Sequence, residues 1–389
     1  MTSRTRAVVL LVSAPVIAFA LVGGVLGKAL TRSETYQHLR VFEDVVSLIA
    51  GNYVEDVDMS RVMRGAMRGL AEGLDPDSAY LSAEEVSLVA SGDKGQPGEV
   101  GIELTRAYYL RIIATREMSP AARVGLRASD FVRAIDGRPT REMSVVEGMR
   151  RLRGVPGSKV TLLVIRGNAA EPHSVELTRE VLSAPDVTAR IGTDRVGHIR
   201  IAAFGPEAVK AVASKAAELE RSGAAGLVVD VRDTATGALE AGVAMARLFV
   251  PAGTLALREV RGAAREPIVA APGDGVVKLP AVVLVSDGTS GAAEIFASAL
   301  GANNRAALVG ERTQGRAALQ KLVRLPDGTG MLVSNAWYLT PAGVPIHEKG
   351  LAPTVAVEVP EVEFGAPAPT ADPVLDKGIE QLRAAIKGP

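Results

Sequence analysis

Residues 281–320 read AVVLVSDGTSGAAEIFASALGANNRAALVGERTQGRAALQ, and this stretch decides the fold. The apolar run 281–285 ends at the turn signal SDG, which is typical of a buried strand. Small residues follow, and from Glu294 the apolar residues recur at helical spacing. A second apolar run, 306–309, predicts another strand. Strand, tight turn, helix and strand is a geometry that in many hydrolases places a nucleophile beside the N–H donors of a helix N-terminus.

The sequence around this stretch alternates between strand and helix patterns. Apolar or alternating runs predict further strands, and an alanine-rich stretch predicts a helix between the first two of them. Because strands and helices alternate, we expect an α/β fold. The predicted strands are 196–201, 226–232 and 331–337, and the predicted helix is 206–222.

Composition excludes several classes of function. The chain has 389 residues, zero net charge and no cysteine. The charge balance gives no reason to expect a nucleic-acid partner, and the lack of cysteine excludes a thiol nucleophile, disulfides and a lipoprotein anchor. No cofactor and no metal site are predicted, because the histidines do not lie in a triad or metal-ligand spacing. These histidines are His38, His173, His198 and His347.

The N-terminus predicts a membrane location. Arg4 and Arg6 precede an uncharged run at 7–27, which is long enough for a transmembrane helix. Because a basic flank stays cytoplasmic, we expect a single-pass anchor in a bacterial-type inner membrane, with the bulk of the chain in the periplasm. A cleaved signal peptide with the small-residue site AFA at 18–20 is the alternative.

Two motifs of the opening stretch resemble the C-terminal processing peptidases, or tail-specific proteases, which use a Ser/Lys dyad. The turn GTSGAAEI at 288–295 matches G-S-A-S-A-S-E-I, and TQGRA at 313–317 matches T-F-G-K-G. The segments GLAEGLDPDSAYL at 69–81 and YLTPAGVPIHEKGLAP at 338–353 match further family patterns. The resemblance extends over about 39–382, nearly the whole chain after the apolar run.

The resemblance also implies that the catalytic residues are replaced. The family nucleophile falls on Gly291, its general-base lysine on Arg316 and a family histidine on Asp77. Arginine stays protonated, so Arg316 cannot accept a hydroxyl proton. Of the glycine-rich loop that helps to form the oxyanion hole, one glycine remains, and the relic of this hole falls on Gly237 and Ala292.

We therefore expect an inactive member of a serine-peptidase family that binds peptide C-termini or scaffolds a partner. The alternative is an active endopeptidase that cleaves protein C-terminal tails and uses a shifted nucleophile. Ser290 is the possible substitute, although a shift of one residue turns a side chain away from the site on an extended segment.

The segment SPAARVGLRASDFVRAIDG at 119–137 resembles a PDZ domain, completed by a predicted helix at 145–153 and a strand at 160–164. PDZ domains add a peptide C-terminus as a strand beside a carboxylate-binding loop. The match places peptide binding at Val100, Gly101 and Ile102. Glu99 would weaken the binding of a carboxylate. The alternative is a PDZ fold that only packs against the core.

These patterns predict five consecutive parts. They are a cytoplasmic flank and transmembrane signal-anchor (1–32), an N-terminal helical segment (33–90), a PDZ-like domain (91–172), a peptidase-like α/β core (173–360), and a linker with a C-terminal helix (361–389). The expected partners are peptide or protein C-termini and, through the N-terminal helix, the membrane.

The replaced dyad also predicts an anion site. Arg316 would face the helix N-terminus that begins near Glu294, and a carboxylate would fill the space between them. That carboxylate is either a peptide terminus or an internal acid, for which the sequence offers Asp230, Asp233 and Glu294.

Overall fold

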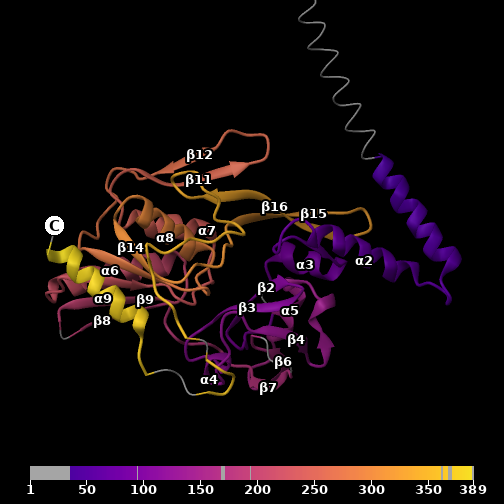
Figure 1. The fold of residues 1–389 in the computed structure, drawn as a ribbon, viewed down its shortest axis with the longest axis horizontal. Helices are drawn as coiled ribbons and strands as arrows, with labels where there is room; N and C mark the ends of the chain where they lie inside the picture. The colour runs from indigo at the N-terminus through magenta and orange to yellow at the C-terminus, as the bar shows by residue number, and fades with distance from the viewer. Residues whose placement is uncertain are drawn as a thin grey trace, which may run out of the picture. The chain divides into compact units, whose positions relative to one another are not determined.

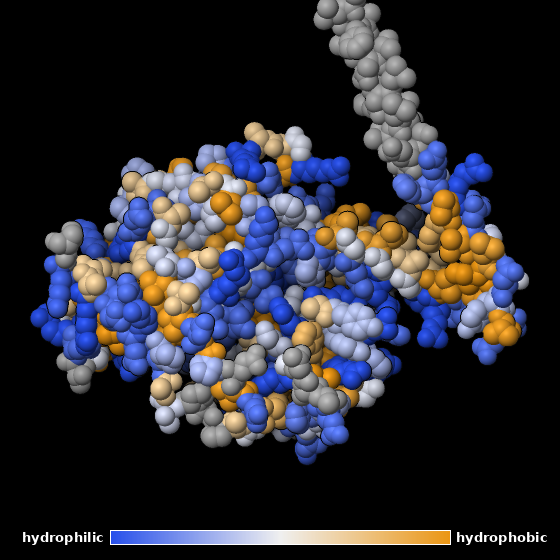
Figure 2. Space-filling model, in the orientation of Figure 1, coloured by the Kyte–Doolittle hydropathy of each residue, from blue (hydrophilic) through white to orange (hydrophobic). Residues whose placement is uncertain are grey.

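The computed structural model describes residues 36–93, 95–167, 171–192, 194–360, 362–366 and 370–387. The chain divides into two compact units, one that ends at Met67 and one that begins at Arg68. In the first unit a helix covers 36–52, and α2 (Met59–Glu72) begins after a short connection. Apolar side chains of 36–54 are exposed, among them Tyr36, Val41 and Val54 (Figure 2).

The structure contradicts the predicted membrane location. Among the described helices, none combines the length and the apolar composition needed to cross a bilayer. A spanning helix needs about 20 predominantly apolar residues. The prediction of an inner-membrane, periplasmic protein is therefore wrong by this structure. The run 7–27, which was its basis, lies outside the described residues.

A six-stranded sheet forms the centre of the second unit (Figure 1). Its strand order is β17-β14-β13-β10-β9-β8, and all pairs are parallel except β8 with β9. The carboxyl ends of the parallel strands therefore meet at one edge, where ligand sites of such sheets lie. The strands are β8 (Val187–Ile191), β9 (Val196–Ile201), β10 (Gly226–Asp230), β13 (Ala281–Val285), β14 (Ala306–Gly310) and β17 (Val355–Ala356).

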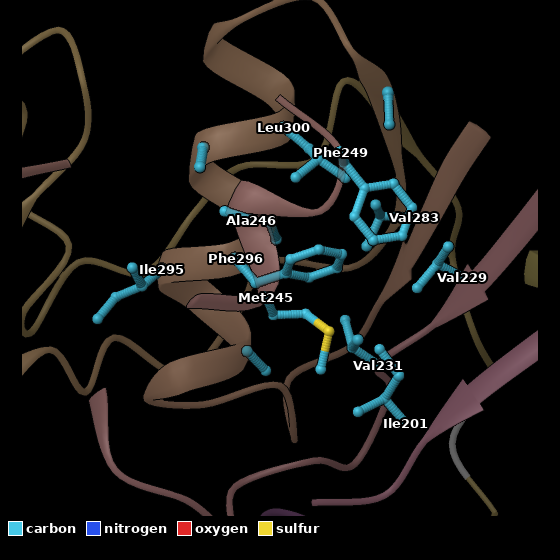
Figure 3. Packing of buried hydrophobic residues seen from close by; sticks show 14 of the residues in the cluster. Ile201, Val229, Val231, Met245, Ala246, Phe249, Val283, Ile295, Phe296 and Leu300 are labelled. Carbon is cyan, nitrogen blue, oxygen red and sulfur yellow. The ribbon is translucent and has the colours of Figure 1, made fainter. Parts of the chain in front are cut away.

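Helices cover both faces of this sheet. On one face α6 (Pro206–Arg221), α7 (Leu239–Arg247) and α8 (Ala292–Ala302) bury their apolar sides in the main core. Phe249 and Phe296 stack edge to face there, with ring centroids 5.5 Å apart (Figure 3). On the other face α9 (Pro373–Lys387) packs through Val374 and Leu382. The central strands are buried on both sides, which explains their unbroken apolar runs.

A second sheet lies beside this core and begins in the N-terminal part of the chain. Its order is β1-β16-β11-β12, and β15 also pairs with β16. After β1 the capping box of Ser82 and Glu85 starts a short helix, α3 (Ala83–Ser91). The strands are β1 (Ala79–Leu81), β11 (Thr254–Val260), β12 (Glu266–Val269), β15 (Ala318–Arg324) and β16 (Gly330–Leu339).

An inserted domain has its own apolar core and an antiparallel sheet of order β2-β3-β4-β6-β7, with β5 paired to β4. Its strands are β2 (Ile102–Ala107), β3 (Tyr109–Thr115), β4 (Phe131–Ile135), β5 (Arg138–Pro139), β6 (Lys159–Ile165) and β7 (His173–Thr178). Its helices are α4 (Pro120–Arg123), the 3-10 turn η1 (Thr140–Glu142) and α5 (Val145–Leu152). Phe364 of the C-terminal linker stacks on His173 of this domain, with ring centroids 4.4 Å apart.

The α/β class is confirmed, and so are the predicted strands and helices of the core. The strand at 281–285, the helix after the tight turn and the strand from 306 form as β13, α8 and β14. One difference concerns the segment 33–90, which the sequence predicts as helical. It also contains β1, which pairs with β16, because a three-residue strand is too short to produce a periodic signal.

The contact between α7 and α8 depends on a glycine. A Cβ on Gly242 would lie 2.2 Å from the carbonyl oxygen of Ala292, so Gly242→Ala forces the two helices apart. We expect a loss of about 1–3 kcal/mol in the free energy of unfolding, measured by chemical denaturation. Gly69→Ala is the control, because nothing lies within 4 Å of its Cβ position and alanine favours the exposed helix by about 1 kcal/mol. Equal effects of the two changes would contradict this close contact.

Candidate functional site

The tight turn between β13 and α8 ends at Gly291, which caps the helix. Its backbone has φ 65° and ψ −121°, a region that glycine adopts freely and other residues avoid. A Cβ built there would have only ordinary contacts, 3.6 Å to Leu239 Cδ2 and 3.8 Å to the carbonyl oxygen of Arg316. The turn therefore keeps a backbone conformation that would strain other residues, together with open space for a side chain that Gly291 does not have.

Glu294 fixes the position of the loop opposite this turn. Its carboxylate is 0% exposed and accepts the N–H groups of Gly291 (3.0 Å), Gly315 (2.7 Å) and Arg316 (2.7 Å). The hydroxyl of Thr313 donates a fourth hydrogen bond. Burial raises the pKa of the Glu294 carboxyl, and the four donors offset part of this effect. Glu294 thus joins the N-terminus of α8 to the loop that carries Arg316.

The side chain of Arg316 forms an ion pair with an acid far away in the sequence. Its Nε lies 2.8 Å from Oδ1 of Asp77, whose side chain is 4% exposed. Gln320, which follows on β15, donates a hydrogen bond to the backbone carbonyl of Asp77. His347 is also buried there, with Nδ1 4.0 Å from the Asp77 carboxylate.

This arrangement corrects the prediction of an anion site. An internal acid does form an ion pair with Arg316, but it is Asp77 and none of the three acids that the sequence offered. Asp230 pairs with Arg232 at 2.7 Å, and Glu294 binds backbone N–H groups. Asp77 reaches Arg316 because the turn before β1 lies beside β15 and β16, a pairing that local sequence does not reveal.

Asp230 and Arg232 form a structural ion pair at the end of β10. Burial raises the pKa of Asp230, but the nearby His198, with Nε2 at 3.7 Å, and the hydrogen bonds and charge of Arg232 outweigh burial and hold that pKa far below its usual range. Arg232 also binds Asp372 of the C-terminal segment at 2.8 Å. The pair therefore secures the segment before α9 and does not face the turn at Gly291.

The loop that contains Gly237, in which the sequence analysis placed the relic of an oxyanion hole, lines the same cavity as Gly291. Gly237 has φ 133°, and a Cβ there would lie 2.3 Å from the carbonyl oxygen of Phe204, so only glycine fits. Ala292 is the first residue of α8 and is 2% exposed. Thr236, next to Gly237, donates its hydroxyl to Glu103 of the inserted domain at 3.1 Å. The loop is thus tied to that domain.

Ser290, the possible substitute nucleophile, is 1% exposed, and its hydroxyl has no hydrogen-bond partner among the described residues. Its backbone N–H binds the carbonyl oxygen of Thr234. The side chain does not belong to the lining of the cavity that contains Gly291 and Arg316. This geometry gives Ser290 neither a base nor access to substrate.

Two cavities share Arg316 and Gln320. The first, of about 350 Å³, lies between α3, α5 and β16, with Leu88, Met149 and Leu332 among its lining residues. The second, of about 370 Å³, is called the central cleft here. Residues 235–240, which form a loop and the start of α7, line one part of it. The other lining residues are Glu103, Gly291, Arg316, Ala318, Leu319 and Gln320. The cleft thus brings together Gly237, Gly291 and Arg316, as the sequence predicted.

Sequence reasoning missed Glu103 and Gln320 in this cleft. The only signal for Glu103 is the alternation along β2, which points it away from its neighbours Ile102 and Leu104. No signal marked Gln320. Within the described ranges, no group of three acidic, histidine or cysteine side chains is arranged as a set of metal ligands.

In the predicted peptide-binding loop, a ligand could contact the backbone but not the side chains, which are buried or absent. Val100 and Ile102 are 1% and 5% exposed and belong to the core of the inserted domain. Gly101 has φ 75°, and a Cβ there would lie 2.3 Å from Cβ of Ser119. Glu99 is not an isolated charge, because Arg153 binds it at 2.6 Å. In the described sheet β2 is an edge strand, so its outer side is available for pairing.

Comparisons with known proteins agree with this architecture. Residues 195–357 match the family model of peptidase family S41, and residues 112–166 match that of the PDZ domain. The carboxyl-terminal-processing protease of Synechocystis sp. is 34% identical over 319 residues, which is 80% of this chain and 74% of the relative. The carboxy-terminal processing protease CtpA of Bacillus subtilis is 28% identical over 316 residues, 80% of this chain and 67% of that protein.

Among solved structures, the photosystem II D1 C-terminal processing protease superposes with a TM-score of 0.69 at 29% identity. The match covers 82% of this chain and 86% of that chain.

We expect the ion pair of Arg316 and Asp77 to stabilise the folded state. Arg316→Ala leaves the buried carboxylate of Asp77 without its cation, so we expect the free energy of unfolding to fall by about 3 kcal/mol. The exposed Arg312 is the matched control, and Arg312→Ala should change the value by about 0.5 kcal/mol or less. In the background Asp77→Asn the effect of Arg316→Ala should shrink. Equal losses for both arginines would show that Arg316 carries no structural ion pair.

Proposed function

Because the chain belongs to peptidase family S41, together with the carboxyl-terminal processing proteases, we propose that it is a catalytically inactive member that binds protein C-terminal tails. The observation that carries this proposal is the state of the two dyad positions. Gly291 has no side chain, and Arg316 is a permanent cation paired with Asp77 at 2.8 Å.

Neither step of serine-peptidase chemistry has a residue to perform it. A lysine base works because burial lowers its pKa until it is neutral, and a guanidinium does not lose its proton near neutral pH. The carboxylate of Asp77 stabilises the charge of Arg316 further. Removal of one member of such a catalytic unit lowers turnover on the order of a millionfold, and here both are replaced.

An active endopeptidase is the second candidate, since the similar proteins are named proteases. It would need Ser290 as nucleophile. The burial of Ser290 and the absence of a hydrogen-bond partner for its hydroxyl among the described residues argue against this role. The physical evidence therefore favours an inactive family member over an active endopeptidase.

Tail binding is supported by the PDZ domain. The outer edge of β2 can accept an extended peptide as an added strand, and the backbone of residues 99–102 lies at the start of this edge. The pair of Glu99 and Arg153 reduces the repulsion that an isolated glutamate would exert on a terminal carboxylate. The domain therefore combines a strand edge with a loop of near-neutral charge.

We expect no proteolysis by the full-length chain. The test is incubation with an unfolded protein that ends in small apolar residues, followed by mass spectrometry. A relative that keeps serine and lysine at the two positions serves as the positive control. Cleavage that the Ser290→Ala variant abolishes would contradict the proposal and identify Ser290 as the nucleophile.

Tail binding should depend on the free carboxylate. In isothermal titration, a peptide with a free C-terminus should bind about tenfold more tightly than its amide, which corresponds to about 1.4 kcal/mol. Arg153→Ala leaves Glu99 unpaired beside the loop, so it should weaken binding of the free acid and not of the amide. Equal binding of the two peptides would show that the domain does not recognise the terminus.

A further inference from the structure

We propose that the central cleft accepts a basic side chain of the bound tail, with Glu103 as its anionic partner. This inference rests on the tail binding proposed above and specifies which C-terminal tails bind best. A lysine or arginine at a defined position would distinguish the preferred tails from other C-termini.

Glu103 is a half-buried carboxylate that makes no ion pair with any described residue. Its one hydrogen bond comes from the hydroxyl of Thr236 at 3.1 Å. Burial raises the pKa of Glu103, because the cleft solvates the charged form poorly, and this effect outweighs the charges of Arg316 and Arg153 and the hydrogen bond from Thr236. A cation placed in the cleft would relieve this unfavourable burial.

The charge balance of the cleft favours a cation over an anion. Arg316 is the one cationic lining residue, and Asp77 neutralises it at 2.8 Å. Glu240, on the first turn of α7, adds a second carboxylate to the lining. The cleft is therefore acidic overall. Leu239 and Leu319 provide apolar walls along which the aliphatic part of a lysine or arginine can pack.

The geometry of β2 connects this cleft to the tail. Ile102 and Leu104 point into the core of the PDZ domain, and Glu103 between them points into the cleft. A tail that pairs with the outer edge of β2 alternates in the same way. Every second side chain of the tail therefore lies on the same face of the sheet as Glu103, and the intervening side chains lie on the opposite face.

The test is a lysine scan of one tail. The parent peptide has a free C-terminus and no charged side chain, and each derivative carries a single lysine, moved one position at a time. Titrated against the full-length chain, lysine should raise affinity about tenfold at one of the alternate positions, the one nearest Glu103, and leave it nearly unchanged at the positions on either side of it.

Glu103→Gln, which keeps the shape of the side chain, should abolish this gain. Glu240→Gln should reduce the gain by less. Glu176→Gln is the matched control, because Glu176 lies exposed on β7 at the opposite edge of the same sheet. Thermal melting of each variant verifies that it is folded.

Two results would overturn the inference and leave tail binding intact. One is an equal gain at every position, which would indicate unspecific attraction. The other is a gain that survives Glu103→Gln. If the parent peptide and all its derivatives fail to bind, the proposed function is wrong and the inference falls with it.

Discussion

The buried carboxylate of Glu294 is the interaction on which the site depends. An ionised carboxylate inside a protein costs several kcal/mol unless hydrogen bonds compensate it. Here three backbone N–H groups and one hydroxyl do so, and they come from the turn at Gly291 and from the loop 313–316. These contacts use the backbone of both segments. The contacts with Glu294 therefore do not use the side chains at positions 291 and 316.

These contacts determine what the replaced residues can do. The backbone of Arg316 is held by Glu294, and its side chain extends to Asp77, so one acid fixes the main chain and another neutralises the charge. In the resemblance to the processing peptidases, Asp77 stands at a histidine position and Arg316 at a lysine position. A change from a neutral base to a permanent cation is thus matched by an anion beside it, as a buried charge requires.

The loops at the carboxyl ends of the strands also hold the PDZ domain. Thr236 binds Glu103, Gln314 binds Arg111 at 3.0 Å, and Asp287 binds Ser129 at 3.0 Å. These polar side chains connect two parts of one protein, and Glu103 reaches the cleft through these contacts.

The sequence by itself determined the α/β class and the strand, turn and helix around Gly291. These features follow from local periodicity, turn residues and motif spacing, which act over a few residues. Tertiary structure alone decided that Asp77 pairs with Arg316 and that Glu103 enters the cleft. It also overturned the membrane location that the apolar N-terminal run predicted. Ion pairs between distant loops depend on how strands are ordered in space, and no local pattern records that order.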